Sequence, residues 1–200
     1  MRFLTVVVSA LVMMTAPAFA QIETYKLEKP HTQIIFSVSH LGFSHSYGKF
    51  TDYDGTIVFD RGQPEKSKVD VVIKTASIEM NDQKWNDHMK NADFFNVEKF
   101  PDMTFKSINI LLDKDDKNEA KISGELTILG VTKTVTLDVE FNKADKHPMK
   151  DIMMAGFSAT GKIKRSDFGM NYGLPMVGDE VEMIIEVEAI QENGESVTNN

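Results

Sequence analysis

The chain has 200 residues, no cysteine and a formal net charge of −8, from 22 Lys and Arg against 30 Asp and Glu. The lack of cysteine excludes thiol catalysis, thiolate zinc sites and a lipid anchor on a cysteine. The acidic balance argues against binding to nucleic acid or to anionic membranes, because like charges repel. A chain of this length suits one domain with a sizeable core.

The first twenty residues have the pattern of a cleaved signal peptide. Arg2 precedes an apolar run over residues 3–14, and Ala18 and Ala20 stand at the positions that a signal peptidase reads. The run is too short to span a bilayer, which takes about 20 apolar residues. We therefore predict export, to the periplasm in a cell with two membranes, and no integral membrane segment after cleavage of residues 1–20. The alternative is an N-terminal membrane anchor.

Alternation of apolar and polar residues dominates the rest of the chain and predicts β-strands. In chain order, the alternating segments fall at residues 32–40, 69–74, 102–106, 121–128, 134–141, 155–163 and 181–189. Turn signals or polar loops separate them at residues 60–64, 113–118, 129–133 and 142–151. Residues 192–200 are polar and form a predicted C-terminal tail.

One stretch, residues 81–91, breaks the alternation. Trp85, His88 and Met89 stand at the i, i+3 and i+4 positions there, so they share one side of a helix. We predict a short helix between two strands.

The number and patterning of the strands favour a closed antiparallel β-barrel over residues 21–191. Seven or eight strands with only one short helix bury their edges best by closing the sheet, because closure leaves no exposed edge. A barrel of about eight strands is either filled by side chains or holds one small ligand. Its inward face is rich in Phe, Val, Ile and Met, so a bound ligand would be apolar.

The candidate ligand-binding residues form a predicted wall and a predicted mouth. The wall candidates are Phe36, Val38, Met103, Phe105, Leu126, Ile128, Leu137, Val139, Phe157, Val181, Met183 and Ile185. The mouth candidates, near loops or the helix, are Phe43, Phe50, Trp85, Phe94, Phe95 and Phe168, together with His40. For the wall residues, ordinary core packing is the alternative.

Two of the mouth candidates carry more than one interpretation. Trp85 either caps a pocket or plugs the barrel end. His40 either contacts a ligand headgroup or is a histidine whose hydrogen bonds are satisfied within the protein.

No metal ligand and no cofactor site is assigned. His31 and His40 flank one predicted strand, which places them about 30 Å apart on opposite faces at about 3.3 Å per residue. His40, His45 and His88 remain as a set that the fold would have to bring together. The competing functions are therefore a metal-dependent periplasmic enzyme that uses these histidines at the barrel mouth, or a ligand-free stress or scaffold barrel with a packed interior.

Several sequence blocks, taken in order, resemble the YceI-like family. They lie at residues 31–41, 48–50, 54–55, 76–79, 87–89, 92–95, 99–107, 124–132 and 164–170, with 177–181 before the last strand. The resemblance runs from about residue 24 to residue 190. Trp85-Asn86 stands where the family often has Arg-Asp, and Met80 where it often has Thr.

The resemblance implies a lipocalin-like antiparallel barrel in the periplasm that binds polyisoprenoids or similar long-chain lipids. Several members are similar to binders of quinone tails and some form dimers, so the implied partners are a long-chain isoprenoid or fatty lipid and a second copy of the chain. Arg165, Asp167 and Phe168 match the family motif near the end of a strand. We expect an Arg165–Asp167 pair to close the barrel end, with ligand contact as the alternative, and we expect no enzymatic activity.

Overall fold

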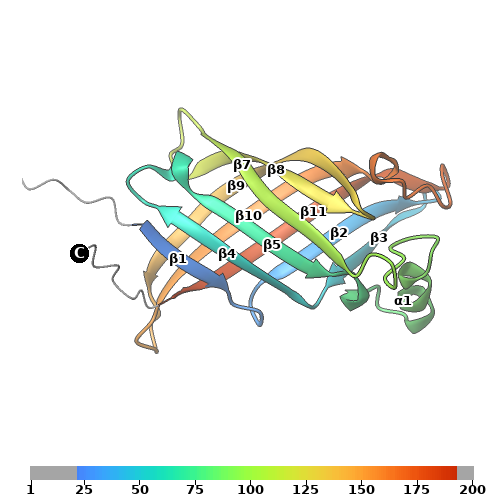
Figure 1. Cartoon of the computed structure of the whole chain (residues 1–200), viewed down its shortest axis with the longest axis horizontal. Helices are drawn as coiled ribbons and strands as arrows, with labels where there is room; N and C mark the ends of the chain where they lie inside the picture. Colours follow the sequence, from blue (N-terminus) through green and yellow to red (C-terminus); the bar gives the residue numbers. More distant parts are fainter. Residues whose placement is uncertain (1–21, 193–200) are drawn as a thin grey trace, which may run out of the picture.

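The computed structural model describes residues 22–192 and consists almost entirely of strands (Figure 1). The predicted signal peptide at residues 1–20 and the tail beyond Glu192 lie outside the described residues. Within residues 22–192, no helix has the length and apolar character needed to cross a membrane.

Eleven strands and one α-helix make up the described part of the chain. The strands are β1 (Ile22–Leu27), β2 (Gln33–His40), β3 (Ser44–Phe50), β4 (Tyr53–Asp60), β5 (Lys68–Lys74), β6 (Ile78–Glu79), β7 (Asp102–Leu112), β8 (Glu119–Ile128), β9 (Val131–Lys146), β10 (Met153–Lys164) and β11 (Val177–Gln191). The helix α1 spans Gln83–Lys90, and short 3-10 helices lie at Pro64–Lys66, Thr75–Ser77 and Arg165–Phe168.

These strands occupy eight positions in one closed antiparallel sheet (Figure 1). The order β1-β4-β5-β7-β8-β9-β10-β11 closes because β1 also pairs with the end of β11. The earlier part of β11 pairs with β2, β2 with β3, and β3 with β6. Strands β2, β3 and β6 therefore continue the positions of β1, β4 and β5 along the barrel. The predicted all-β, lipocalin-like barrel of about eight strands with one short helix is confirmed.

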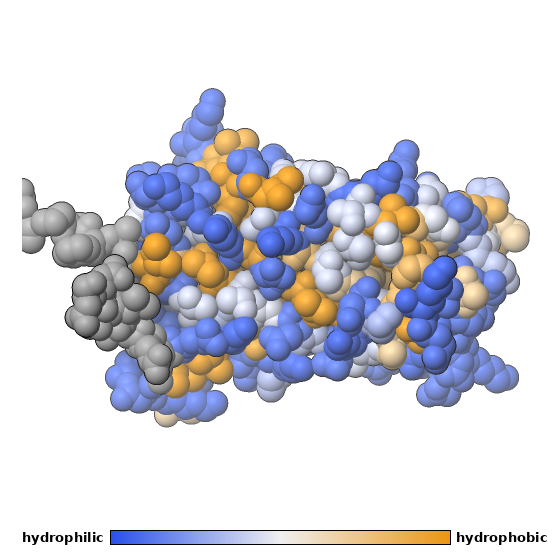
Figure 2. Space-filling model, in the orientation of Figure 1, coloured by the Kyte–Doolittle hydropathy of each residue, from blue (hydrophilic) through white to orange (hydrophobic). Residues whose placement is uncertain are grey.

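Period-two alternation decides which side chains face the inside of the barrel. On β11, Val181, Met183 and Ile185 line the interior, while Glu182 and Glu186 alternate with them. Polar side chains predominate on the outer face, with smaller apolar areas between them (Figure 2). The inward assignments made from the sequence follow directly from this pleat.

The polar connection predicted at residues 142–151 is shorter in the structure, where β9 ends at Lys146 and β10 begins at Met153. Strand β9 continues to Lys146, because residues 143–146 pair with residues 153–156 of β10 in backbone register. Side chains on both faces of this extension are polar or small, so the alternation ends while the hydrogen-bonded ladder continues. Backbone hydrogen bonding alone extends the strand here, so the extension leaves no alternating pattern in the sequence.

The helix α1 begins one residue after its N-cap, Asp82. The Asp82 carboxylate accepts a hydrogen bond from the Trp85 backbone N–H at 3.0 Å, which satisfies one of the free donors of the first turn. The Asn86 side-chain oxygen accepts a hydrogen bond from the Met80 N–H at 2.6 Å. This bond ties the helix to the residue that follows β6, so the side of α1 that carries Trp85 covers one end of the barrel.

Candidate functional site

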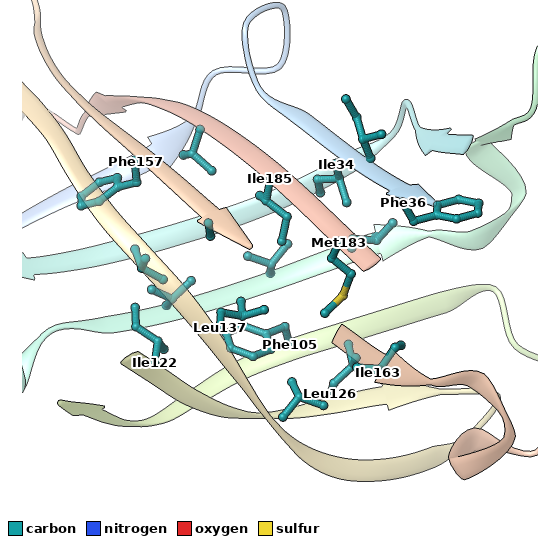
Figure 3. A pocket seen from close by; sticks show the side chains of 18 of the residues that line it. Ile34, Phe36, Phe105, Ile122, Leu126, Leu137, Phe157, Ile163, Met183 and Ile185 are labelled. Carbon is teal, nitrogen blue, oxygen red and sulfur yellow. The ribbon is translucent and has the colours of Figure 1, made fainter. Parts of the chain in front are cut away.

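A cavity of about 1050 Å³ runs through the inside of the barrel. Side chains from facing strands point into it, and the ten that are labelled in Figure 3 are all apolar. Ligand pockets usually measure about 300–1,000 Å³. The cavity volume therefore lies slightly above the usual range and is large enough for a long ligand.

Ionisable side chains line the cavity only near its two ends among the described residues. His40, His88, Arg165 and Tyr172 lie at the α1 end, and Arg61, Glu65, Asp113, Lys114 and Lys117 lie at the opposite end. The middle of the barrel is lined by aliphatic and aromatic side chains and by residues without charge. A long apolar chain fits such a middle section, and charged or polar groups fit only at the ends.

Most of the candidate ligand-binding residues line this cavity. These are Phe36, Val38, His40, Phe50, Trp85, Phe94, Phe95, Met103, Phe105 and Phe157. The remaining wall candidates, Leu126, Ile128, Leu137, Val139, Val181, Met183 and Ile185, line it as well. Contact between these side chains and a ligand stays a prediction.

Two of the mouth candidates do not line the cavity, and their placement is corrected. Phe43 stands at the tip of the β2–β3 hairpin and is 91% exposed. Phe168 is 2% exposed and packs in the hydrophobic core at the end of the barrel. Both lie near the mouth in sequence, but one side chain points to solvent and the other into the core.

Ile57 and Phe59 on β4 line the cavity although they were not among the predicted wall residues. The sequence does contain the alternation that predicts a strand here. The residues that alternate with the inward ones are Asp54, Thr56 and Asp60, with Val58 as the one apolar exception. The rings of Phe59, Phe141 and Phe157 pack together with centroids 5.3–5.7 Å apart. This aromatic cluster lies toward the end of the barrel opposite α1.

Two glycines let large rings lie flat against the barrel wall. A Cβ on Gly124 would lie 2.5 Å from the Phe105 ring and 2.7 Å from the Lys106 carbonyl oxygen, and a Cβ on Gly48 would collide with the Phe36 ring. Phe36 and Gly48 are direct cross-strand partners. Each ring therefore covers a glycine backbone and leaves the interior open.

Replacing Gly124 with alanine is expected to lower the free energy of unfolding by about 1–3 kcal/mol, the usual cost of overpacking. The new methyl group would push the Phe105 ring off the wall and press on the Lys106 carbonyl oxygen. Gly156→Ala is the matched control, because its Cβ would meet no atom closer than 3.7 Å. Urea unfolding of both variants measures the difference, and equal midpoints would contradict this account of the glycines.

Aromatic rings surround the mouth at the α1 end. The Trp85 ring centroid lies 6.2 Å from that of His40. His88, Phe94 and Tyr172 form a three-ring cluster with centroids 5.0–5.3 Å apart. Trp85 lines the cavity and is also 43% exposed, so its indole lies between the interior and solvent. This position fits a cap at the mouth better than a plug in the barrel end.

Arg165 shapes the segment that follows β10 and forms no pair with Asp167, so the predicted Arg165–Asp167 pair is wrong. Arg165 is 5% exposed, and its guanidinium donates to four backbone carbonyls at 2.8–3.0 Å. The acceptors are Met170, Tyr172, Val177 and Gly178. Asp167 is exposed. The loop backbone folds over the guanidinium and leaves no place for a side-chain partner there.

Asp179 holds the start of the 3-10 helix Arg165–Phe168. Its carboxylate accepts hydrogen bonds from the Ser166 backbone N–H at 2.9 Å and the Ser166 hydroxyl at 2.8 Å. The backbone hydrogen bond in particular lowers the pKa of Asp179. Because the folded-state pKa lies below the unfolded one, this contribution to stability is present above about pH 4 and is lost as the pH falls through the folded-state pKa.

Asp179→Asn is therefore expected to lower the free energy of unfolding by about 1 kcal/mol at neutral pH, the usual size for one hydrogen bond. The difference from the original protein should shrink as the pH falls below 4 and the carboxylate is protonated. Urea unfolding across this pH range measures it. A difference that stays constant with pH would show that the Asp179 charge contributes nothing.

Potential metal ligands gather outside the cavity. Among residues 22–192, one group of three comes within ligand distance, namely Glu28, His31 and Glu188, with His31 Nδ1 2.9 Å from Glu28 Oε2 and 3.8 Å from Glu188 Oε2. His40, His45 and His88, the set considered from the sequence, are not a group of this kind in that part of the chain. The geometry thus gives no support to the enzyme alternative built on them.

The closed barrel and its apolar interior place the protein in the class of lipocalin-like β-barrels with an internal chamber. Residues 25–189 match the YceI-like domain, and the chain belongs to the YceI-like family. It is 41% identical over 170 residues to Protein YceI of Salmonella arizonae and of Salmonella enteritidis, an alignment that covers 84% of this chain and 87% of each relative.

Solved structures share the fold. The Campylobacter jejuni YceI protein is 38% identical and superposes with a TM-score of 0.69 over 77% of this chain and 90% of its own. Burkholderia cenocepacia BcnA is 23% identical, with a TM-score of 0.73 over 81% and 98%. A polyisoprenoid-binding domain from Saccharophagus degradans is 11% identical, with a TM-score of 0.60 over 86% and 100%. The last two show likeness of fold alone.

Proposed function

We propose that this protein is a periplasmic binding or carrier protein that holds a long-chain apolar lipid, such as a polyisoprenoid or a quinone tail, inside its barrel. The observation that carries the proposal is the apolar cavity of about 1050 Å³ with ionisable groups only near its ends. A lipid chain in the middle would leave no charged group desolvated, because that section carries none.

The energetics allow such binding. Burial of one CH2 group contributes about 0.8 kcal/mol, so roughly twenty groups contribute about 16 kcal/mol before costs. Association itself costs about 4–15 kcal/mol. Affinity should therefore depend strongly on the length of the tail, because each added CH2 group inside the barrel contributes further.

Two further observations support the proposal. The Saccharophagus degradans domain of the same fold is a polyisoprenoid-binding domain. The open interior counts against a ligand-free scaffold, which would need packed side chains in its place. Export rests on the sequence of residues 1–20 and is part of the proposal.

The test is organic extraction and mass spectrometry of the protein purified without detergent from the periplasmic fraction of its own cells. We expect one long-chain lipid or quinone per barrel and an N-terminus at Gln21. An extract free of lipid, together with no uptake of added polyisoprenoids, would overturn the carrier function. Retention in the cytoplasmic fraction would overturn the location.

A further inference from the structure

Large apolar side chains are exposed on the loops around the α1 end of the barrel. Phe43 is 91% exposed and Met176 is 63% exposed, and Leu41, Trp85 and Tyr172 are also exposed. We call these five residues the apolar rim. They come from the β2–β3 hairpin, from α1 and from the segment before β11, which are far apart in sequence.

Contacts bring the three parts of the rim together around the cavity mouth. The Leu41 backbone N–H donates to the Met176 carbonyl at 2.8 Å, which joins the hairpin to the segment before β11. The Tyr172 ring lies 5.3 Å from that of His88, one turn along α1 from Trp85. Tyr172 and Trp85 line the cavity as well. The rim is therefore continuous with the apolar interior.

The backbone of the hairpin fixes Phe43 at the tip. Leu41 and Gly42 both have positive φ, +53° and +72°, so the chain turns tightly before Phe43. The Phe43 N–H donates back to the His40 carbonyl at 3.0 Å. A large ring is thus held in water on a short turn, where it contributes nothing to the core.

Charged residues are absent from the two loops that carry most of the rim. Residues 38–48 and residues 168–178 contain no Asp, Glu, Lys or Arg, although 26% of the chain is charged. The loops at the other end, residues 60–67, 113–118 and 142–151, are rich in charge. The two loops at the α1 end are therefore uncharged, although α1 itself carries exposed Lys84 and Asp87, whereas the loops at the other end are charged. The cavity reaches both ends.

We propose that the apolar rim inserts into the surface of a phospholipid bilayer, where the barrel takes up or releases its lipid. The inference rests on the proposed function, because it names the surface from which the ligand would come. Insertion would join the cavity to the hydrocarbon layer, so that the apolar chain passes between them without crossing water. The uncharged loops would enter without the cost of desolvating a charge.

The residue types and the net charge specify the kind of surface. Trp and Tyr favour the membrane–water interface, where one part of the ring is apolar and another meets water. The net charge of −8 gives no attraction to anionic lipids. Binding should therefore depend on apolar contact with zwitterionic lipid and change little with salt.

The test is flotation of the purified protein with phosphatidylcholine vesicles, at low and at high salt. We expect the original protein to float with the vesicles at both salt concentrations. Phe43→Ser should lower the partition constant roughly tenfold to hundredfold, because it removes one phenyl ring that would be buried in the bilayer. Trp85, the single tryptophan, remains in this variant and reports insertion by energy transfer to a dansyl-labelled lipid.

Met149→Ser is the matched control. Met149 is 86% exposed, close to the exposure of Phe43, but lies in the charged loop between β9 and β10 at the opposite end. This variant should float as the original protein does. Both substitutions replace exposed side chains, and circular dichroism should show both variants folded.

Three outcomes would overturn the inference. The protein would fail to float with the vesicles, or Phe43→Ser and Met149→Ser would float equally well. In the third, the protein would not bind vesicles, and the rim would instead pair two copies of the chain. Sedimentation would then show a dimer that Phe43→Ser abolishes. If the purified protein contains lipid but does not bind vesicles, membrane insertion of the apolar rim is overturned and the carrier function stands. If a lipid-free barrel binds vesicles through Phe43, the carrier function is overturned and membrane insertion stands.

Discussion

Ala159→Trp is expected to weaken binding of long-chain lipids roughly 200-fold while the barrel still folds. Ala159 lies midway along β10 and lines the cavity, with Val139 and Ile185 as its cross-strand partners. An indole at this position would project into the middle of the cavity and divide it. If about four CH2 groups are kept out, the loss of about 3 kcal/mol lowers affinity roughly 200-fold.

Titration with polyisoprenoids of increasing length measures this effect. The original protein should gain affinity with each added unit, and Ala159→Trp should stop gaining once the chain reaches the indole. Thr160→Trp adds the same ring on the outer face, where Thr160 is exposed, and should leave affinity unchanged. An unchanged length dependence in a folded Ala159→Trp barrel would place the ligand elsewhere. Ala159→Phe provides a smaller obstruction if the indole overpacks the interior.

Arg165→Ala is expected to lower the free energy of unfolding by at least about 4 kcal/mol. The variant removes a charged donor from four backbone carbonyls, and hydrogen bonds to charged groups contribute about 1.5–3 kcal/mol each. Single domains are stable by only about 5–15 kcal/mol, so this is a large share of the total. Urea unfolding measures the loss.

Two further variants separate the role of Arg165 from that of Asp167. Arg165→Lys keeps the charge but has a single ammonium group in place of the planar fork, so an intermediate loss of stability is expected. Asp167→Ala should change stability by no more than about 0.5 kcal/mol, because the carboxylate is exposed and contacts no partner in the described part of the chain. If Asp167→Ala and Arg165→Ala lowered the free energy of unfolding by similar amounts, the result would support the Arg165–Asp167 pair expected from the sequence.

The candidate site illustrates which parts of a barrel can be predicted from periodicity. The wall residues were found because a strand exposes alternate side chains to one face, whatever its neighbours are. Ile57 and Phe59 on β4 obey the same period-two rule, so their inward direction is also predictable from the sequence. Phe43 and Phe168 were misplaced because a loop has no such period, so proximity in sequence says nothing about the direction of a side chain.

The sequence by itself determined the barrel class, the inward and outward faces of the strands and the presence of the short helix, because each depends on local pattern. Only the tertiary structure decided that the interior is open, since Phe36 lies over Gly48 and Phe105 over Gly124 from neighbouring strands. It also decided the partners of Arg165 and the meeting at the rim of the β2–β3 hairpin, α1 and the segment before β11. These features depend on segments that are distant in the chain and meet only when the sheet closes.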